Sequence, residues 1–156
     1  MKKALIIPIL LIVLCACTRQ EYGILPYQQK NIEATLNVNE EFKIKLTKTE
    51  KTSLEILEPE GLKGMSFILE ENGILARNGD TEIMLDKKKL DGIYAIGQIF
   101  SLNEASLTTA ENNQFSFEQN DTHYKLTLGK NDLPKEIEIS SNSFYYEITV
   151  EAIRLN

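Results

Sequence analysis

The sequence has no tryptophan, one histidine and two cysteines among its 156 residues. A zinc finger needs four cysteine or histidine ligands, and a disulfide-rich scaffold needs several cysteine pairs, so both classes are excluded. No nucleophile motif accompanies His123, and the chain has no glycine-rich phosphate loop and no aspartate-rich calcium loop. We therefore expect a surface histidine, and neither a catalytic site nor a metal or cofactor site.

Positive charge is also scarce, because 17 lysines and arginines face 23 aspartates and glutamates and leave a formal net charge of −6. A nucleic-acid partner would require clustered basic residues, so this class of partner is excluded. Lys87–Lys89 form a short basic run between Asp86 and Asp91. A solvated loop and a contact with anionic lipid both fit this run, and the acidic balance of the chain favours the solvated loop.

The N-terminus is the one long apolar segment. Lys2 and Lys3 precede an apolar stretch over residues 4–14, which is shorter than the ~20 residues of a membrane span but typical of a signal peptide. The following Leu14-Cys15-Ala16-Cys17 resembles a bacterial lipobox, with an aliphatic residue at −3 and a small residue at −1 of Cys17. Cys15 does not fit this pattern, because Leu14 would then occupy position −1, where a small residue is expected.

This resemblance implies a signal peptide over residues 1–16, acylation of Cys17, and a lipidated tether over residues 17–30. Two or more acyl chains such as palmitate anchor a protein stably, whereas a single chain does not. We expect the protein on the extracytoplasmic face of the cell membrane, or on the outer membrane if the cell has one. An ordinary secreted protein and an uncleaved anchor helix are the alternatives.

From residue 31 onward, apolar residues recur with the period of two that is typical of half-buried strands. The predicted strands cover 31–38, 42–47, 52–58, 65–70, 74–77, 81–85, 106–110, 114–119, 123–128, 135–140 and 144–155. Asn39-Glu40, Asn72-Gly73 and Asn78-Gly79 are predicted hairpin turns. Ile153 and Leu155 are out of phase with Val150, which predicts a bulge near residues 151–152.

Residues 90–102 break this pattern, because their apolar side chains recur at helical spacing. Asp91 is the expected N-cap, and Gly92 and Gly97 should each weaken the helix by ~1 kcal/mol relative to alanine. The apolar stripe of this helix must pack on the apolar face of the sheet. The predicted fold is mainly β: a curved antiparallel sheet, or half-barrel, whose concave face is covered by one central helix.

Four features together resemble the LolA/LolB family of lipoprotein carriers: the lipobox, Pro59-x-Gly61-x-x-Gly64 after a strand and before an aromatic residue, the mid-chain helix, and the late strand Leu133-Pro134-Lys135-x-Ile137-x-Ile139. Related clostridial lipoproteins, including a germination lipoprotein that assists an amidase, are similar as well. The resemblance implies a half-barrel domain over residues 31–156 with an apolar cavity that can hold acyl chains. The candidate cavity-lining residues are Phe42, Ile44, Phe67, Ile96, Phe100, Phe115, Phe117 and Tyr146.

Two functions remain open at this point. The first is a non-catalytic accessory module that binds an envelope protein partner through a sheet edge or its polar face. The second is a carrier or binder of an acyl chain or another apolar ligand in the cavity. A filled interior with an exposed apolar edge would favour the first function, and an open pocket beneath the helix would favour the second. The short helical segment favours the accessory module.

Overall fold

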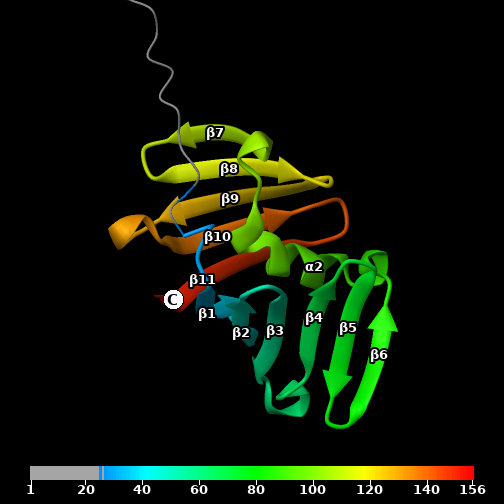
Figure 1. Cartoon of the computed structure of the whole chain (residues 1–156). Helices are drawn as coiled ribbons and strands as arrows, with labels where there is room; N and C mark the ends of the chain where they lie inside the picture. The colour runs from blue at the N-terminus through cyan, green and yellow to red at the C-terminus, as the bar shows by residue number, and fades with distance from the viewer. Residues whose placement is uncertain (1–24, 26) are drawn as a thin grey trace, which may run out of the picture.

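The computed structural model describes residue 25 and residues 27–156, so the lipobox and Cys17 lie outside the described residues. The described chain forms one antiparallel sheet in the order β6-β5-β4-β3-β2-β1-β11-β10-β9-β8-β7 (Figure 1). The strands are β1 (Ile32–Val38), β2 (Phe42–Lys48), β3 (Thr52–Glu58), β4 (Ser66–Glu70), β5 (Gly73–Asn78), β6 (Thr81–Leu85), β7 (Leu107–Glu111), β8 (Gln114–Gln119), β9 (Thr122–Leu128), β10 (Pro134–Ser140) and β11 (Tyr145–Leu155). The fold is therefore mainly β, as predicted.

Sheet neighbours are consecutive along the chain everywhere except at β1 and β11, which pair at the centre. The two edge strands, β6 and β7, are not paired with each other, so the sheet is open. Residues 86–106 must lead from one edge to the other, and they carry α2 (Asp91–Gln98), the one α-helix among the described residues. In Figure 1 the strands of the two halves run in different directions, as expected for a strongly twisted sheet.

The strand register places the apolar side chains on one face, because directly opposed residues of paired strands point to the same side. One apolar row runs across seven strands through Ala110, Phe115, Leu126, Ile137, Ile148, Val38 and Phe42. A parallel row contains Leu107, Phe117, Tyr124, Ile139 and Tyr146. The opposite face carries ion pairs such as Lys45–Glu33 at 3.0 Å and Lys125–Glu138 at 2.8 Å.

The predicted bulge in the last strand is confirmed. Thr35 lies opposite Ala152 while the next residue, Leu36, lies opposite Val150, so Glu151 is the additional residue of β11. This insertion restores the phase of the strand, and Ile153 faces Ala34 on the apolar side. Ile153 and Leu155 are therefore half-buried and pack against the same core.

One of the three predicted turns has the expected residues at its centre. Asn39 and Glu40 have φ values of 52° and 59°, and the Glu41 N–H donates to the Val38 carbonyl at 3.0 Å, as in a type I′ turn. The predictions for Asn72-Gly73 and Asn78-Gly79 are wrong by one residue. Gly73 already pairs with Glu70, so the central residues are 71–72, and Asn78 pairs with Thr81, so the central residues are 79–80.

The predicted helix is present but shorter than 90–102, because α2 ends at Gln98 and a 3₁₀ turn, η4 (Ile99–Ser101), follows it. The N-cap prediction for Asp91 is wrong: Leu90 occupies the cap position and Asp91 is the first helical residue. The Asp91 carboxylate accepts a hydrogen bond from the neighbouring Gly92 N–H at 2.8 Å. A side-chain cap occurs one turn earlier, where Asp86 accepts from the Lys88 N–H at 2.8 Å and starts η3 (Lys87–Lys89).

Both helix glycines are explained by close packing on the sheet. A Cβ at Gly97 would lie 2.6 Å from a Leu69 methyl carbon of β4, and a Cβ at Gly92 would collide with the Tyr146 hydroxyl of β11. Leu69 and Tyr146 belong to opposite halves of the sheet. The helix therefore contacts both halves. The glycines permit this close approach because they have no side chain, at a cost in helix propensity.

The chain before β1 is docked on η4. Tyr27 is 1% exposed and meets the Phe100 ring edge to face, with centroids 5.9 Å apart. The half-buried Lys48 ammonium donates to the carbonyls of Gln28 at 2.7 Å and Phe100 at 2.6 Å. Burial lowers the pKa of Lys48, because the charged amine loses water. Within the described part of the chain, no helix is long and apolar enough to span a membrane.

Candidate functional site

The predicted cavity residues belong to the apolar core. Six of them are buried in one contiguous cluster, namely Ile44, Phe67, Ile96, Phe100, Phe115 and Phe117. Phe42 and Tyr146 are half-buried and pack against that cluster. The structure thus brings all eight residues to the same core, and their role in lining a ligand cavity stays a prediction.

Residues 86–106, which lead from one sheet edge to the other and form the crossing segment, contribute buried side chains to this core. Ile99 and Phe100 are 0% exposed, and Ile96 is 2% exposed. Tyr27, which lies within the predicted tether, adds a large ring next to Phe100. The apolar face is therefore covered by side chains of the protein itself at the position where η4 and residue 27 meet.

The Tyr27 hydroxyl is unusual, because it is buried and has no hydrogen-bond partner among the described residues. Burial raises the pKa of Tyr27 well above its usual value, since a phenolate would be poorly solvated there. This residue remains a neutral donor at any physiological pH. The sequence contains no direct signal for it, because Tyr27 lies in a polar segment whose docking depends on the distant η4.

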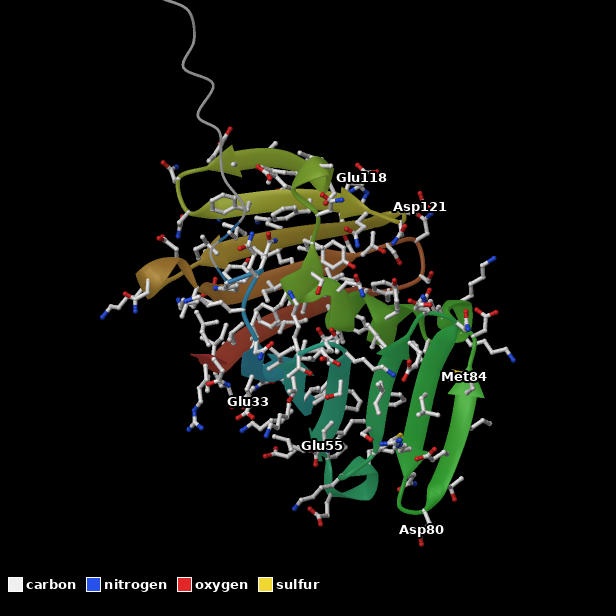
Figure 2. The ribbon with its side chains drawn as sticks, viewed as in Figure 1. Glu33, Glu55, Asp80, Met84, Glu118 and Asp121 are labelled. Carbon is white, nitrogen blue, oxygen red and sulfur yellow. The ribbon has the colours of Figure 1, made fainter. Side chains whose placement is uncertain are left out.

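The edge strand β6 exposes apolar side chains. Ile83 is 56% exposed and Met84 is 51% exposed, although both lie within a strand. Ile83 lies opposite Ala76 on the apolar face, and Met84 lies opposite Leu75 on the other face. Figure 2 shows Met84 on the outermost strand, with Asp80 at the tip of the same hairpin. Both faces of β6 therefore present apolar surface next to the strand edge that β5 leaves unpaired.

Lys87–Lys89 follow β6 after one residue, Asp86. The Lys87 ammonium lies 5.1 Å from the centre of the Tyr94 ring, which is a cation–π contact. Lys88 and Lys89 form no ion pair with any described residue and are exposed. The predicted solvated loop is thus a 3₁₀ turn that places free positive charge beside the apolar edge.

The opposite edge differs in character. The exposed residues of β7 are polar: Thr108, Thr109 and Glu111. Native sheets usually protect an edge by charge, proline or a bulge. The register of β7 is irregular between Leu107 and Thr109, whereas β6 pairs regularly, contains no proline, and has one charged residue, Glu82, that is paired with Arg77 at 2.6 Å. Of the two edges, β6 is therefore the one suited to binding another polypeptide.

The remaining polar candidate is His123. The side chain of His123 is 64% exposed, with Nδ1 3.8 Å from a Glu118 carboxylate oxygen, so the prediction of a surface histidine is confirmed. Among residues 27–156 and residue 25, no cluster of three histidine, cysteine, aspartate or glutamate side chains could hold a metal ion.

No family model and no curated protein matches the sequence. Among solved structures, the chain is similar to an uncharacterized conserved protein from Thermus thermophilus, with 12% identity, a TM-score of 0.48, and coverage of 85% of this chain and 83% of that chain. It is also similar to a LolA superfamily protein from Nitrosomonas europaea, with 12% identity, a TM-score of 0.41, and coverage of 81% and 84%. A domain from Vibrio parahaemolyticus named for outer membrane lipoprotein sorting has 10% identity, a TM-score of 0.41, and the same coverage of both chains.

Proposed function

We propose that this chain is a lipid-anchored, non-catalytic protein of the cell envelope that binds a protein partner through the edge strand β6. Residues 1–16 are its signal peptide, acylated Cys17 and residues 17–30 form its anchor and tether, and residues 31–156 form its half-barrel domain. In this proposal α2 covers the concave face of the half-barrel. The protein is held on the extracytoplasmic face of the cell membrane, or on the outer membrane where one exists.

One observation carries the proposal: β6 combines a free strand edge with the exposed side chains of Ile83 and Met84. An extended peptide that adds to a sheet edge gains main-chain hydrogen bonds, and its alternate side chains contact the two faces of the edge. Lys88 and Lys89 lie just beyond the end of β6 and have no carboxylate partner among the described residues. The partner segment that fits this surface is therefore extended and acidic at the end that reaches η3.

In-cell photo-crosslinking tests this proposal. A photoreactive residue at Met84 should trap one envelope protein, and the same residue at Thr108 on the opposite edge is the matched control. Reversing the charges of Lys88 and Lys89 to glutamate should reduce the yield at Met84. Equal crosslinking from both edges, or no crosslinked product from Met84, would contradict partner binding through β6.

The anchor is tested separately by membrane fractionation. Cys17→Ala should release the protein from the membrane fraction, because no other cysteine has a small residue before it and an aliphatic residue at −3. Cys15→Ala is the control and should leave the protein in the membrane fraction. Membrane retention of the Cys17→Ala chain would contradict the lipoprotein assignment.

Binding of an acyl chain is the second candidate function, and the Tyr27 hydroxyl favours it. A buried donor with no partner among the described residues can satisfy the carbonyl of an apolar ligand in the core. We rank it second because Phe100 and Ile99, which are fully buried, already occupy the neighbouring apolar space.

A further inference from the structure

The polar face carries a pocket that neither the predicted apolar cavity nor the β6 edge involves. Its volume is about 380 Å³, which lies within the range of about 300–1,000 Å³ found for small-molecule sites. It is formed at the end of β1, in the turn after it, and at the start of β11. The lining residues are Asn37, Asn39, Glu40, Tyr145, Glu147 and Thr149.

Strand geometry explains why these six residues converge. Tyr145, Glu147 and Thr149 alternate along β11 and so share one face, and Asn37 of β1 lies directly opposite Thr149. Asn39 is fixed beside them, because its N–H donates to the Glu147 carbonyl at 2.8 Å. In return the Asn39 side-chain oxygen accepts from the Glu147 N–H at 2.8 Å. The pocket wall is therefore held by hydrogen bonds between strand and turn.

The Tyr145 ring forms an aromatic side of the pocket and is 52% exposed. Its hydroxyl donates to a Glu147 carboxylate oxygen at 3.0 Å, and this hydrogen bond raises the pKa of Tyr145. That bond holds the hydroxyl end of the ring, and about half of the side chain stays exposed to solvent. An open aromatic face is a platform on which the C–H side of a sugar ring can stack.

The polar groups of the pocket include both donors and acceptors that remain free. The second Glu147 oxygen, the Glu40 carboxylate and the Thr149 hydroxyl form no hydrogen bond with another described residue, and the Asn37 amide reaches only Glu151, at 3.5 Å. Each hydroxyl of a sugar both donates and accepts, so it matches this mixed set. Two carboxylates disfavour an anionic ligand, and the nearby Lys43 is already paired with Glu151 at 3.1 Å.

We propose that this pocket binds an uncharged pyranose saccharide. The sugar ring stacks on Tyr145, and its hydroxyls bond to Glu147, Asn37 and Thr149. The site lies on the polar face at the centre of the sheet, where β1 pairs with β11, whereas the proposed partner surface lies at the β6 edge. The two proposals therefore succeed or fail independently.

Isothermal titration calorimetry on the full chain in phosphatidylcholine nanodiscs tests the pocket, since nanodiscs avoid glycoside detergents. The probes are cellotetraose, maltotetraose, mannotetraose and chitotetraose, with tetragalacturonate as the anionic counterpart. At least one uncharged probe should bind saturably, and tetragalacturonate should not. Tyr145→Ala and Glu147→Gln should each weaken that binding by about tenfold or more, as expected when a stacked ring or a charged acceptor is removed.

Asp80→Asn is the charge-matched control, because it removes one carboxylate at the tip of the β5–β6 hairpin and should leave the affinity unchanged. Thermal melts check that each variant is folded. Saturation-transfer difference NMR should show the strongest transfer to the sugar C–H protons, and Tyr145→Ala should abolish it. The proposal is overturned if no uncharged tetrasaccharide binds, if the variants bind as the parent does, or if tetralysine competes for the site more tightly than the sugars.

Discussion

Phe100 connects the crossing segment, the docked N-terminal segment and the sheet, so its truncation tests the packing of the whole apolar face. The ring is 0% exposed, contacts Tyr27 edge to face, and belongs to the buried cluster that includes Phe67 and Phe117. Replacing a buried phenylalanine by alanine typically costs ~3–5 kcal/mol, because transfer free energy is lost and a cavity remains. We expect Phe100→Ala to fall in this range.

The measurement is a pair of urea melts followed by circular dichroism. The midpoint should fall while the slope with urea stays constant, which indicates a change in stability alone. In thermal melts the same loss corresponds to roughly 10 °C or more for a domain of this size. Leu62→Ala is the apolar control on an exposed 3₁₀ turn, η2 (Glu60–Leu62), and should stay within about 0.5 kcal/mol of the parent. Equal and small losses from both substitutions would refute the assignment of η4 to the core.

Three further outcomes follow from the packing, the titration and the register. Gly97→Ala should destabilise the protein by about 1–3 kcal/mol despite a better helix propensity, because its Cβ would lie 2.6 Å from a leucine methyl of β4. Gly61→Ala is the control and should be nearly neutral, since a Cβ at Gly61 meets nothing within 4 Å. Thermal or urea melts in which the two variants have equal stability would disprove the close approach of Gly97 to β4. Tyr27→Phe should stabilise the fold by about 1 kcal/mol, since it removes a buried donor that has no partner among the described residues. Because the pKa of Tyr27 is raised in the folded protein, the unfolded chain releases this proton first as the pH rises above the ordinary tyrosine pKa. The free energy of unfolding is therefore unaffected by this group below that pKa and falls above it. The loss of stability at alkaline pH should be shallower in Tyr27→Phe than in the parent. Deleting Glu151 should preserve the fold, because it removes the bulge and leaves a regular alternation of apolar and polar residues in β11. Deleting Thr149 is the control and should not preserve the fold. Two deletion variants that are equally unfolded by circular dichroism would contradict the register.

The strands were predictable because their signal is local. Alternation of apolar and polar residues gave the exact limits of β3, β6 and β8, and the phase change after Val150 gave the bulge of β11. These features depend only on which side chains must face one core. The same alternation put six of the candidate residues on one strand face, and these six belong to the core or pack against it: Phe42, Ile44, Phe67, Phe115, Phe117 and Tyr146.

The turns and the helix start were less predictable, because neighbouring strands decide them. The hairpin after β4 turns at residues 71–72 since Gly73 is already paired with Glu70, and a Cβ there would lie 2.6 Å from the Leu85 carbonyl oxygen. Gly73 is therefore needed because β5 and β6 approach each other closely at this point, and rules for turn sequences do not take such contacts into account. Glycine is required at positions 92 and 97 for a similar reason: a Cβ there would clash with Tyr146 or Leu69, which are far away in the sequence.

The two surfaces proposed as binding sites depend on long-range pairing. Ile83 and Met84 are exposed because β6 is an edge strand, and the alternation within Thr81–Leu85 does not reveal the position of a strand in the sheet. Asn37 and Thr149 become neighbours only because the first and last strands pair at the centre. Sequence patterns can indicate strands, whereas the sites follow from the order in which those strands assemble.

The central claim is that the protein binds through its surface, because its interior is filled by its own side chains. Lipid analysis of the chain purified from cells tests this claim most directly. The Cys17→Ala chain should be used, so that covalently attached acyl groups do not contribute to the signal. Native mass spectrometry should then show the bare polypeptide, and added fatty acid or lysolipid should give no saturable thermal shift, although a ligand at 100 times its dissociation constant would add ~2.7 kcal/mol. A stoichiometric lipid that survives purification, and that is lost when Ala34 or Ala76 is replaced by leucine, would contradict the account and identify the protein as an acyl-chain binder.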